Sequence, residues 1–413
     1  MVIVWLLLAL GVVIVVLFWK RISASWLEYV ERRYRQKKNW KLLEVTIPIE
    51  VTKGPKAMEQ VLIALHQPGA NIIEKRFWFK GLQNIFSKID CFLDQWIRGK
   101  RKEFSLELMG RAREVHSYIR VPGEYRNLVE SVIYSQYPQA EIVEQNDYTE
   151  DFPVELIGSV YDLWSAEFVL AKDSVYPIKT YLSFEGKKGK TEVVDPLSHV
   201  FEVISELKKD EAIWLQMIIR PAPESFYQRG EKVIAELSKK KPPSKSPAEV
   251  FIDFLSNLIR APFEPVLTEK EEKKKAPSLS QRERKIIEAI ENKLSKLAYQ
   301  VGIRFIYIDR IDAFTASNVS AVRQFFSLFS SLDLNAFKMK PISVKVPVTA
   351  RKFLKRKREY LMSYKERKFP QESSILSTEE LASIYHYPTE AVEVPIFRKK
   401  PKKAKPPSEL PVM

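Results

Sequence analysis

Gly186–Thr191, with the sequence GKKGKT, is the segment of the chain that comes nearest to a phosphate-binding loop. In such a loop four residues separate the first glycine from the Gly-Lys-Thr, so that backbone amides can wrap the phosphates. Only two residues, Lys187 and Lys188, intervene here, and the next segment ends in the helix-capping residues Asp195 and Pro196 instead of running directly into a helix. The sequence therefore predicts a hairpin or surface loop here and no nucleotide cofactor.

Residues that could ligate a metal or act as nucleophiles are few and scattered. The four histidines, His66, His116, His199 and His386, lie far apart, and none has the spacing of a zinc site. The one cysteine, Cys91, excludes an internal disulfide and has no histidine near it in sequence. No serine-hydrolase, zinc-protease or carboxylate-rich metal motif is present in the sequence. We therefore predict no catalytic, cofactor-binding or metal-binding residue and expect a protein that is not an enzyme.

A strong excess of positive charge is the clearest chemical property of the chain. Its 67 lysines and arginines outnumber 52 acidic residues, which gives a formal net charge of +15. Such a balance favours an anionic partner, either lipid headgroups or nucleic acid. The alternative, that lysine-rich linkers only keep the protein soluble, stays open at this point.

Two groups of residues are the candidates for binding an anionic partner. Those expected at a membrane lipid or another anionic surface are Arg32, Arg33, Arg35, Lys37, Lys38, Lys80, Lys88, Trp96, Arg98, Lys100 and Arg101. Those expected to contact nucleic acid, the alternative partner, are Arg351, Lys352, Lys355, Arg356, Lys357 and Arg358. Few aromatic residues are interleaved with the second group, so the sequence does not indicate a base-stacking platform.

Residues 1–19 contain no charged side chain and, at about 1.5 Å per residue, are long enough to cross a bilayer. This segment predicts an N-terminal transmembrane helix, followed by a basic juxtamembrane helix over residues 20–40. A cleaved signal peptide would need basic residues ahead of the apolar run, and there are none, but Ser23, Ala24 and Ser25 resemble a cleavage site and keep this alternative open. Basic residues follow the run, so the positive-inside rule predicts a single-pass cell-membrane protein with its N-terminus outside and its body cytoplasmic.

Residues 41–150 show the pattern of a strand-helix-strand-strand-helix-strand unit. Period-two alternation over residues 43–51 predicts the first strand, and an apolar stripe at helical spacing after Pro55 predicts the first helix. This order is that of the split βαβ, ferredoxin-like fold. An amphipathic insert over residues 76–102 interrupts it. The insert predicts either a helix packed on the sheet or a helix lying in the plane of a membrane.

Residues 154–345 predict a second α+β body. A nearly continuous apolar run over residues 213–219 predicts a central strand, and a capping box at residues 280–283 predicts a helix start. A charged insertion over residues 239–279 interrupts this body, and residues 346–413 predict a basic Pro/Lys-rich tail that is partly disordered. The expected fold class is α+β, with an N-terminal transmembrane helix followed by two ferredoxin-like (split βαβ) α/β bodies and the tail.

Four stretches of the chain occur in a recognisable order. They are residues 103–122, with EFSLE and VHSYIRVP; 134–149, with YSQYPQAE and DYT; 195–216, with DPL and EAIWLQ; and 379–388, with EELASIYHYP. This order resembles the N-terminal, non-ATPase region of membrane-anchored DNA-translocase ATPases of the conjugation and type IV secretion kind. The resemblance covers most of residues 40–410.

The resemblance implies a scaffold or adaptor and not a motor. In such proteins a RecA-like ATPase domain would begin where this chain stops, at Met413. A separate P-loop ATPase is therefore the expected partner, and a homo-oligomer is expected by analogy with ring-shaped motors. No active-site residue carries over. We expect a membrane-anchored, non-catalytic scaffold subunit of a type IV secretion or DNA-translocation-like apparatus. The alternative is a membrane-tethered nucleic-acid-binding protein that uses the basic tail.

Overall fold

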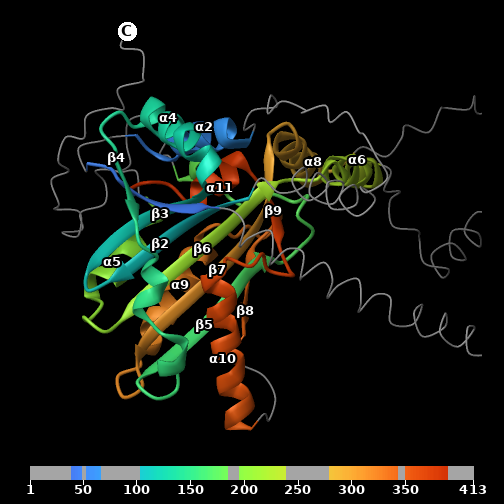
Figure 1. Ribbon diagram of the computed structural model, residues 1–413. Coiled ribbons are helices and arrows are strands. Elements are labelled where there is room, and N and C mark those ends of the chain that lie inside the picture. The colour runs from blue at the N-terminus through green and yellow to red at the C-terminus, as the bar shows by residue number, and fades with distance from the viewer. Residues whose placement is uncertain are drawn as a thin grey trace, which may run out of the picture.

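A computed structural model describes residues 39–48, 53–66, 103–184, 195–238, 279–342 and 349–388 of the 413-residue chain. Within these ranges the chain forms one antiparallel sheet of nine strands with helices on both of its faces (Figure 1).

The first half of the sheet comes from the N-terminal part of the described chain. In chain order its elements are β1 (Trp40–Thr46), α2 (Pro55–His66), β2 (Phe104–Arg111), β3 (Glu114–Pro122), α4 (Arg126–Gln136) and β4 (Glu141–Gln145). The strands lie side by side in the order β4-β1-β3-β2. Side chains of β1 alternate between the two faces of the sheet. Leu43 and Val45 pack in the larger core under the helices, whereas Leu42 packs in the core on the opposite face.

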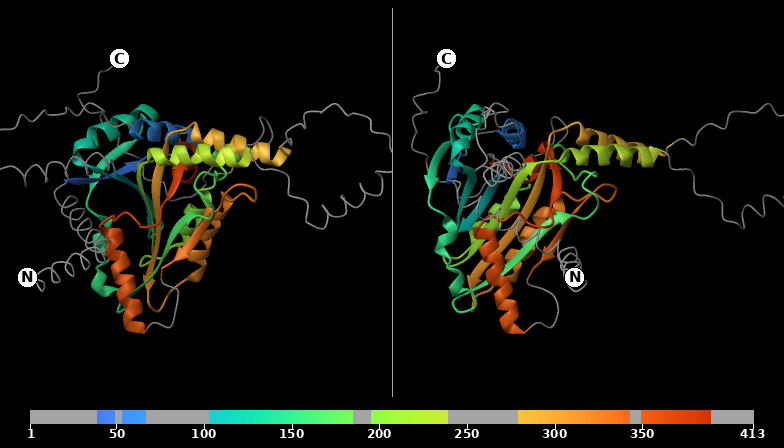
Figure 2. Two further views of the ribbon diagram at one scale, coloured as in Figure 1. Left: turned by 90° about the vertical axis from the view of Figure 1, so that its right-hand side faces the viewer. Right: turned by 45° about the vertical axis from the view of Figure 1, so that its right-hand side comes forward.

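The second half repeats the order strand-helix-strand-strand-helix-strand. Its elements are β5 (Tyr161–Leu170), α5 (Ser198–Glu206), β6 (Ala212–Pro221), β7 (Ala298–Arg310), α9 (Ala316–Leu328) and β8 (Phe337–Pro341). The strands lie in the order β6-β7-β5-β8. Two further helices, α6 (Glu224–Ser238) and α8 (Gln281–Leu294), pack on each other beside the sheet (Figure 2). Helix α8 begins with the predicted capping box, in which Ser280 and Glu283 cap each other's backbone amides.

Strands β2 and β6 join the two halves into one continuous sheet. They pair antiparallel from Phe104 opposite Ile219 to Arg111 opposite Ala212. Nearly every residue of both strands is buried. Because both faces of each strand are buried, neither strand can be a solvent-exposed edge, and pairing them removes both edges. The prediction of two separate ferredoxin-like bodies is therefore wrong, and the two halves share one sheet.

The C-terminal part of the described chain crosses from one face of the sheet to the other. Helix α10 (Ala350–Lys365) lies on one face, β9 (Ser374–Ser377) pairs with the start of β7, and α11 (Thr378–Ile384) is buried on the opposite face against α2. A Cβ on Gly302 of β7 would overlap the ring of Pro370, so the crossing segment lies directly on that strand. The prediction of a basic, partly disordered tail over residues 346–413 is therefore wrong for residues 349–388, which are folded against the sheet.

The two faces of the sheet are covered differently. Helices α2, α4, α5, α9 and α11 cover one face and bury the larger hydrophobic core. The other face is covered by α10 and by a segment with two 3-10 helices, η3 (Tyr148–Asp151) and η4 (Val154–Leu156). Two more 3-10 helices, η2 (Gly123–Tyr125) and η5 (Tyr181–Ser183), lie in connections. Figure 2 shows α9 and α10 on opposite sides of the sheet.

The prediction of a single-pass membrane protein is also corrected. Across the described ranges, no helix is long and apolar enough to span a bilayer. The expected transmembrane helix, residues 1–19, lies outside those ranges, as do residues 20–38, the insert 76–102 and residues 239–278 of the charged insertion. The observed fold class is α+β with one large antiparallel sheet, and the expected cell-membrane localisation, with N-terminus outside and body cytoplasmic, is not carried further.

Candidate functional site on helix α10

Helix α10 combines a buried aromatic face with an unusually basic exposed face. Its sequence, ARKFLKRKREYLMSYK, holds seven cationic residues and one carboxylate. Tyr360, Leu361 and Tyr364 point into the core at helical spacing, and Tyr364 packs on Trp214 of β6 with ring centroids 5.4 Å apart. The Tyr360 hydroxyl donates to the carbonyl of Ala166 on β5 at 3.1 Å. These contacts fix the helix on the sheet and leave its other side exposed.

Contacts near the middle of α10 hold it against the segment around η4. The Lys357 ammonium pairs with Asp162 of β5 at 2.5 Å. The Arg358 guanidinium donates to the carbonyl of Ile157 at 2.8 Å and to that of Glu155 at 3.1 Å. Two of the charges of α10 therefore serve the fold.

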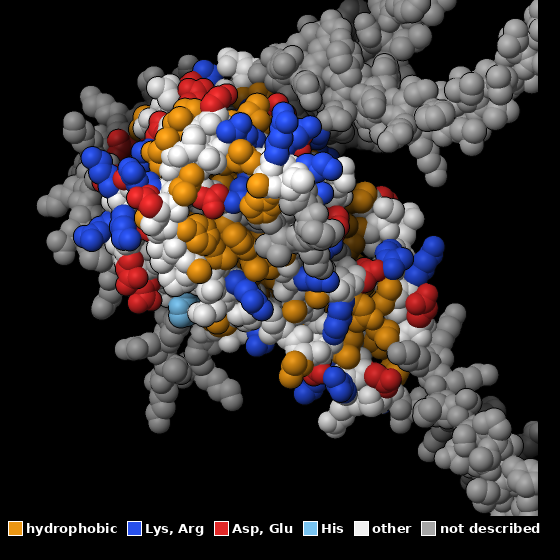
Figure 3. All heavy atoms as spheres, turned by 90° about the horizontal axis from the view of Figure 1, so that it is seen from below, with side chains coloured by type: hydrophobic (Ala, Val, Ile, Leu, Met, Phe, Trp, Pro, Cys, Tyr) orange, Lys and Arg blue, Asp and Glu red, His pale blue; other side chains and the backbone are white. Residues whose placement is uncertain are grey.

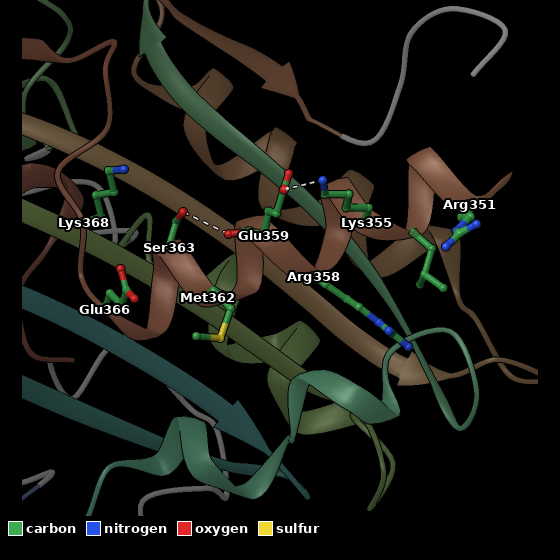
Figure 4. A pocket seen from close by; sticks show the side chains of 9 residues that line it. Arg351, Lys355, Arg358, Glu359, Met362, Ser363, Glu366 and Lys368 are labelled. Atoms are coloured by element: carbon green, nitrogen blue, oxygen red, sulfur yellow. Dashed lines mark hydrogen bonds and ion pairs between the residues drawn. The ribbon is translucent and has the colours of Figure 1, made fainter. Parts of the chain in front are cut away.

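A surface groove of about 770 Å³ runs along the exposed side of α10 (Figure 4). It is lined by Arg351, Leu354, Lys355, Arg358, Glu359, Met362, Ser363, Glu366 and Lys368. Figure 4 shows Lys355 and Glu359 joined along the helix, and their charged atoms are 3.7 Å apart. Met362 is 44% exposed, which leaves an apolar side chain in solvent among the charges. The groove thus offers both apolar contact and positive charge to a partner.

The structure divides the six residues predicted for nucleic acid. The four that stay exposed on α10 are Arg351, Lys352, Lys355 and Arg356, whereas Lys357 is buried and Arg358 is held by backbone carbonyls. The aromatic residues of the helix are not available for stacking, since Tyr360 and Tyr364 are buried and Phe353 lies under the Lys357 ammonium. Sequence reasoning missed the apolar residues of the groove, Leu354 and Met362. Leu354 and Met362 are eight residues apart, with Arg358 midway between them, and this spacing could have indicated that all three lie on one side of a helix.

The residues predicted for lipid or an anionic surface cannot be placed. Outside the described ranges lie Arg32, Arg33, Arg35, Lys37, Lys38, Lys80, Lys88, Trp96, Arg98, Lys100 and Arg101. The same holds for the loop Gly186–Thr191 and for Cys91.

The C-terminal end of α10 is tied to the sheet by a buried ionic network. Arg367, at a positive φ of 49°, donates from Nε and one Nη to the two oxygens of Glu107 on β2, both at 3.0 Å. It also pairs with Asp147, just before η3. The Tyr148 hydroxyl donates to Glu107 at 2.7 Å and lies 3.0 Å from the Tyr364 hydroxyl. The network connects β2, η3 and α10, so the position of the groove depends on it.

Electrostatics hold this network in its ionised form. Burial opposes the charge on Glu107, but the nearby Arg367 and the hydrogen bonds from Arg367, Ser105 and Tyr148 outweigh it and lower the pKa of Glu107. Burial likewise opposes the charge on Arg367, yet Glu107 raises the pKa of that guanidinium. Burial and the Glu107 charge raise the pKa of Tyr148 well above its usual value. A neutral phenol beside a carboxylate and a guanidinium is a stable donor and offers no general base.

Two other buried polar contacts lie at α11 and just after it. Lys293 of α8 lies 2.9 Å from Glu380, and both side chains are 1% exposed. Desolvation lowers the pKa of Lys293, although Glu380 opposes this. His386 has Nε2 3.0 Å from Asp195 and Nδ1 2.9 Å from the carbonyl of Ala382, so both ring nitrogens face acceptors. These groups are engaged by the fold. Among the described residues no group of three metal-ligating side chains is present.

A third polar cluster lies where β7 ends. The Tyr307 hydroxyl is 2.9 Å from Asp309 and 3.2 Å from Glu211, and the two carboxylates are almost completely buried. Burial raises the pKa of Asp309, and the Glu211 charge raises it further. The backbone amide of Arg310 donates to Asp309 at 2.6 Å. The cluster closes the loop that leads from β7 to α9.

The fold and this surface define an α+β protein with one nine-stranded sheet and a cation-rich helix on its less covered face. The chain belongs to the family of a domain of unknown function, DUF8128, whose model matches residues 26–399. The matched range includes both halves of the sheet together with α10, β9 and α11, which agrees with one shared sheet. No curated protein sequence matches the chain.

Proposed function

We propose that the chain is a non-catalytic scaffold or adaptor subunit whose α10 face receives a partner macromolecule. The observation that carries this proposal is the groove itself: it combines an exposed methionine with exposed cations on a helix that is fixed to the sheet. The buried ionisable clusters described above are engaged by the fold and do not line that groove. Surfaces that combine apolar contact with charge are typical of protein recognition.

The proposed partner is a P-loop ATPase of a type IV secretion or DNA-translocation-like apparatus. What supports this part of the proposal is the sequence resemblance of the four stretches within residues 103–388 to the region that precedes such motors. A homo-oligomer, which would match a ring-shaped motor, is part of the same proposal.

Co-purification tests the scaffold proposal. The tagged full-length chain is crosslinked in its native cells, purified after nuclease treatment and examined by mass spectrometry. We expect a P-loop ATPase to be enriched over a parallel purification of an unrelated tagged protein of similar isoelectric point. Purification of the chain without any ATPase would overturn the choice of partner. The nuclease step ensures that an ATPase bridged only through DNA is lost.

A second candidate function is nucleic-acid binding through α10. The observation that favours it is that Arg351, Lys352, Lys355 and Arg356 remain exposed on one helix. One observation argues against a larger nucleic-acid-binding surface. The face of the molecule in Figure 3 mixes cationic side chains with acidic and apolar ones and does not present one continuous basic stripe.

Titration with duplex DNA at several salt concentrations tests this second candidate. Each phosphate contact contributes about 0.9 to the slope of log affinity against log salt. Replacing the four exposed α10 cations with Gln should therefore lower the slope by about 3 to 4. The matched control replaces four exposed lysines elsewhere with Gln, namely Lys208, Lys209, Lys232 and Lys338. Equal losses in the two variants would show that α10 is not the binding site.

A further inference from the structure

The apolar part of the α10 groove lies along one side of the helix. Leu354, Arg358 and Met362 follow one another at intervals of four residues, so they form a row on the helix surface. Leu354 lies against Gly158 at one end of the row, and Met362 is exposed at the other. Such a row provides two apolar contact points separated by an aliphatic arginine stem.

Positive charge borders this row. Arg351 and Lys355 line the groove in the first two turns of α10, and both side chains are exposed. Lys352 and Arg356 lie on the same helix outside the groove and add to the positive potential around it. A partner that fits the groove must therefore carry negative charge beside its apolar residues.

We propose that the α10 groove binds an acidic amphipathic helix of a partner protein, an inference that rests on the proposed adaptor function. The groove extends along α10 from Arg351 to Glu366. These residues are fifteen positions apart, which corresponds to a length of about 22 Å along the helix axis at 1.5 Å per residue. A partner helix of about four turns has this length. Its apolar residues, three and four apart, contact Leu354 and Met362, and its carboxylates face Arg351 and Lys355.

The groove suits a peptide better than a nucleic acid. Glu359 and Glu366 belong to its lining and would face a phosphate backbone with like charge. Among the residues that the structure describes, no aromatic side chain lines the groove, so unpaired bases find none there to stack on. An amphipathic helix can place a cationic residue opposite Glu359 or Glu366 and keep its acidic side toward Arg351 and Lys355.

Site-specific photo-crosslinking tests the occupant. A photoreactive phenylalanine analogue replaces Met362 in the full-length chain, which is expressed in its native cells and irradiated, and the crosslinked peptide is sequenced by mass spectrometry. The control position is Leu332, an apolar residue that is 99% exposed and follows α9, the helix that packs on the face of the sheet opposite α10. We expect an acidic peptide with apolar residues three and four apart, crosslinked from position 362 and not from position 332. A basic peptide, a nucleic acid, a segment of the same chain, or no crosslink would overturn the proposal.

A pair of charge reversals then tests the mode of binding with the crosslinked peptide in synthetic form. Lys355→Glu, inside the groove, is expected to weaken binding at least tenfold in fluorescence anisotropy. Lys352→Glu makes the same charge change three residues away, outside the groove, and is expected to change binding less than threefold. Equal losses would show that general attraction and not the groove binds the peptide. If the ATPase co-purifies with the chain but crosslinks elsewhere, this proposal and the placement of the partner on the α10 face fail, while the adaptor function itself stands.

Discussion

Arg367 and Glu107 form two parallel hydrogen bonds of 3.0 Å across 260 residues of chain. Arg367 is 1% and Glu107 0% exposed, and Asp147 pairs with the same guanidinium. The geometry is a buried bidentate charge pair, which adds geometric specificity to the energy of the contact. Because it joins the turn after α10 to the middle of the sheet, this pair couples α10 to the fold.

The first prediction concerns this pair. Arg367→Met is expected to lower the free energy of unfolding by about 3 to 5 kcal/mol, because it leaves Glu107 as an uncompensated buried charge. Urea denaturation followed by circular dichroism measures the loss. The double variant Glu107→Leu/Arg367→Met removes both charges and should recover most of it. Arg310→Met, at an exposed arginine, is the control and should change stability by less than about 0.5 kcal/mol. A double variant as unstable as the single one would contradict this account.

A second prediction follows from the raised pKa of Asp309. The folded protein holds a proton on this carboxyl more tightly than the unfolded chain does, for which the pKa is about 3.9. Ionising Asp309 in the folded protein therefore lowers the free energy of unfolding. This loss is absent below the pKa of the unfolded chain, grows as the pH rises towards the pKa of the folded protein, and is complete above it. Asp309→Asn should raise the melting temperature at pH 7 and have a smaller effect at pH 4.

Thermal unfolding of the wild type and the variant at the two pH values measures this effect. The control is Asp312→Asn, at a side chain that is 75% exposed only three residues away. It should give little change at either pH. If Asp309→Asn destabilises the protein equally at pH 4 and pH 7, the hydrogen bonds to Tyr307 and Arg310 matter more than the buried charge.

Much of the secondary structure could be predicted from local pattern. The capping box at Ser280 and the helix after Pro55 are confirmed, since each depends on spacing within a few residues. The joining of the two halves was missed. Strand β6 is a nearly continuous apolar run, and that pattern fits equally well a strand covered by helices in a separate body and a strand at the centre of a larger sheet. Strand β2 alternates apolar residues with Ser105 and Glu107, so its sequence did not indicate that both of its faces are buried.

The candidate site was only partly predictable. The density of lysine and arginine after residue 350 indicated binding but also suggested disorder, and it concealed the apolar stripe formed by Tyr360, Leu361 and Tyr364. The exposed cations of α10 could be named from sequence. The roles of Lys357 and Arg367 could not, because their partners Asp162 and Glu107 are about 200 or more residues away in sequence.

The third prediction concerns the segment that crosses the sheet after α10. Gly302→Ala is expected to destabilise the protein by about 1 to 3 kcal/mol, because the added Cβ would overlap the ring of Pro370 and push the segment off β7. Pro370→Ala removes the ring, so the double variant Gly302→Ala/Pro370→Ala should be more stable than the sum of the two single changes implies. Urea denaturation of all four proteins gives this coupling energy. Strict additivity would show that the ring and the strand do not press on each other.

The last prediction concerns the contact that positions the groove, between Leu354 of α10 and Gly158. Gly158 has a φ of 90°, and a Cβ there would overlap the Leu354 side chain, so Gly158→Ala adds both backbone strain and a steric clash. Leu354→Ala relieves only the clash. Gly230 provides the comparison, because a Cβ at Gly230 would overlap Leu294 in the same way without a positive φ.

The two double variants separate the clash from the backbone strain. In Gly230→Ala/Leu294→Ala the clash is removed. The alanine at position 230 should therefore not lower the free energy of unfolding below that of Leu294→Ala alone. In Gly158→Ala/Leu354→Ala a cost of about 1 to 2 kcal/mol should remain, since an L-residue is strained at positive φ. Urea denaturation measures both differences. If no cost remains at Gly158, the loop accepts alanine by changing its φ, and α10 is then positioned by Lys357 and Arg358 instead of by the close approach at Gly158.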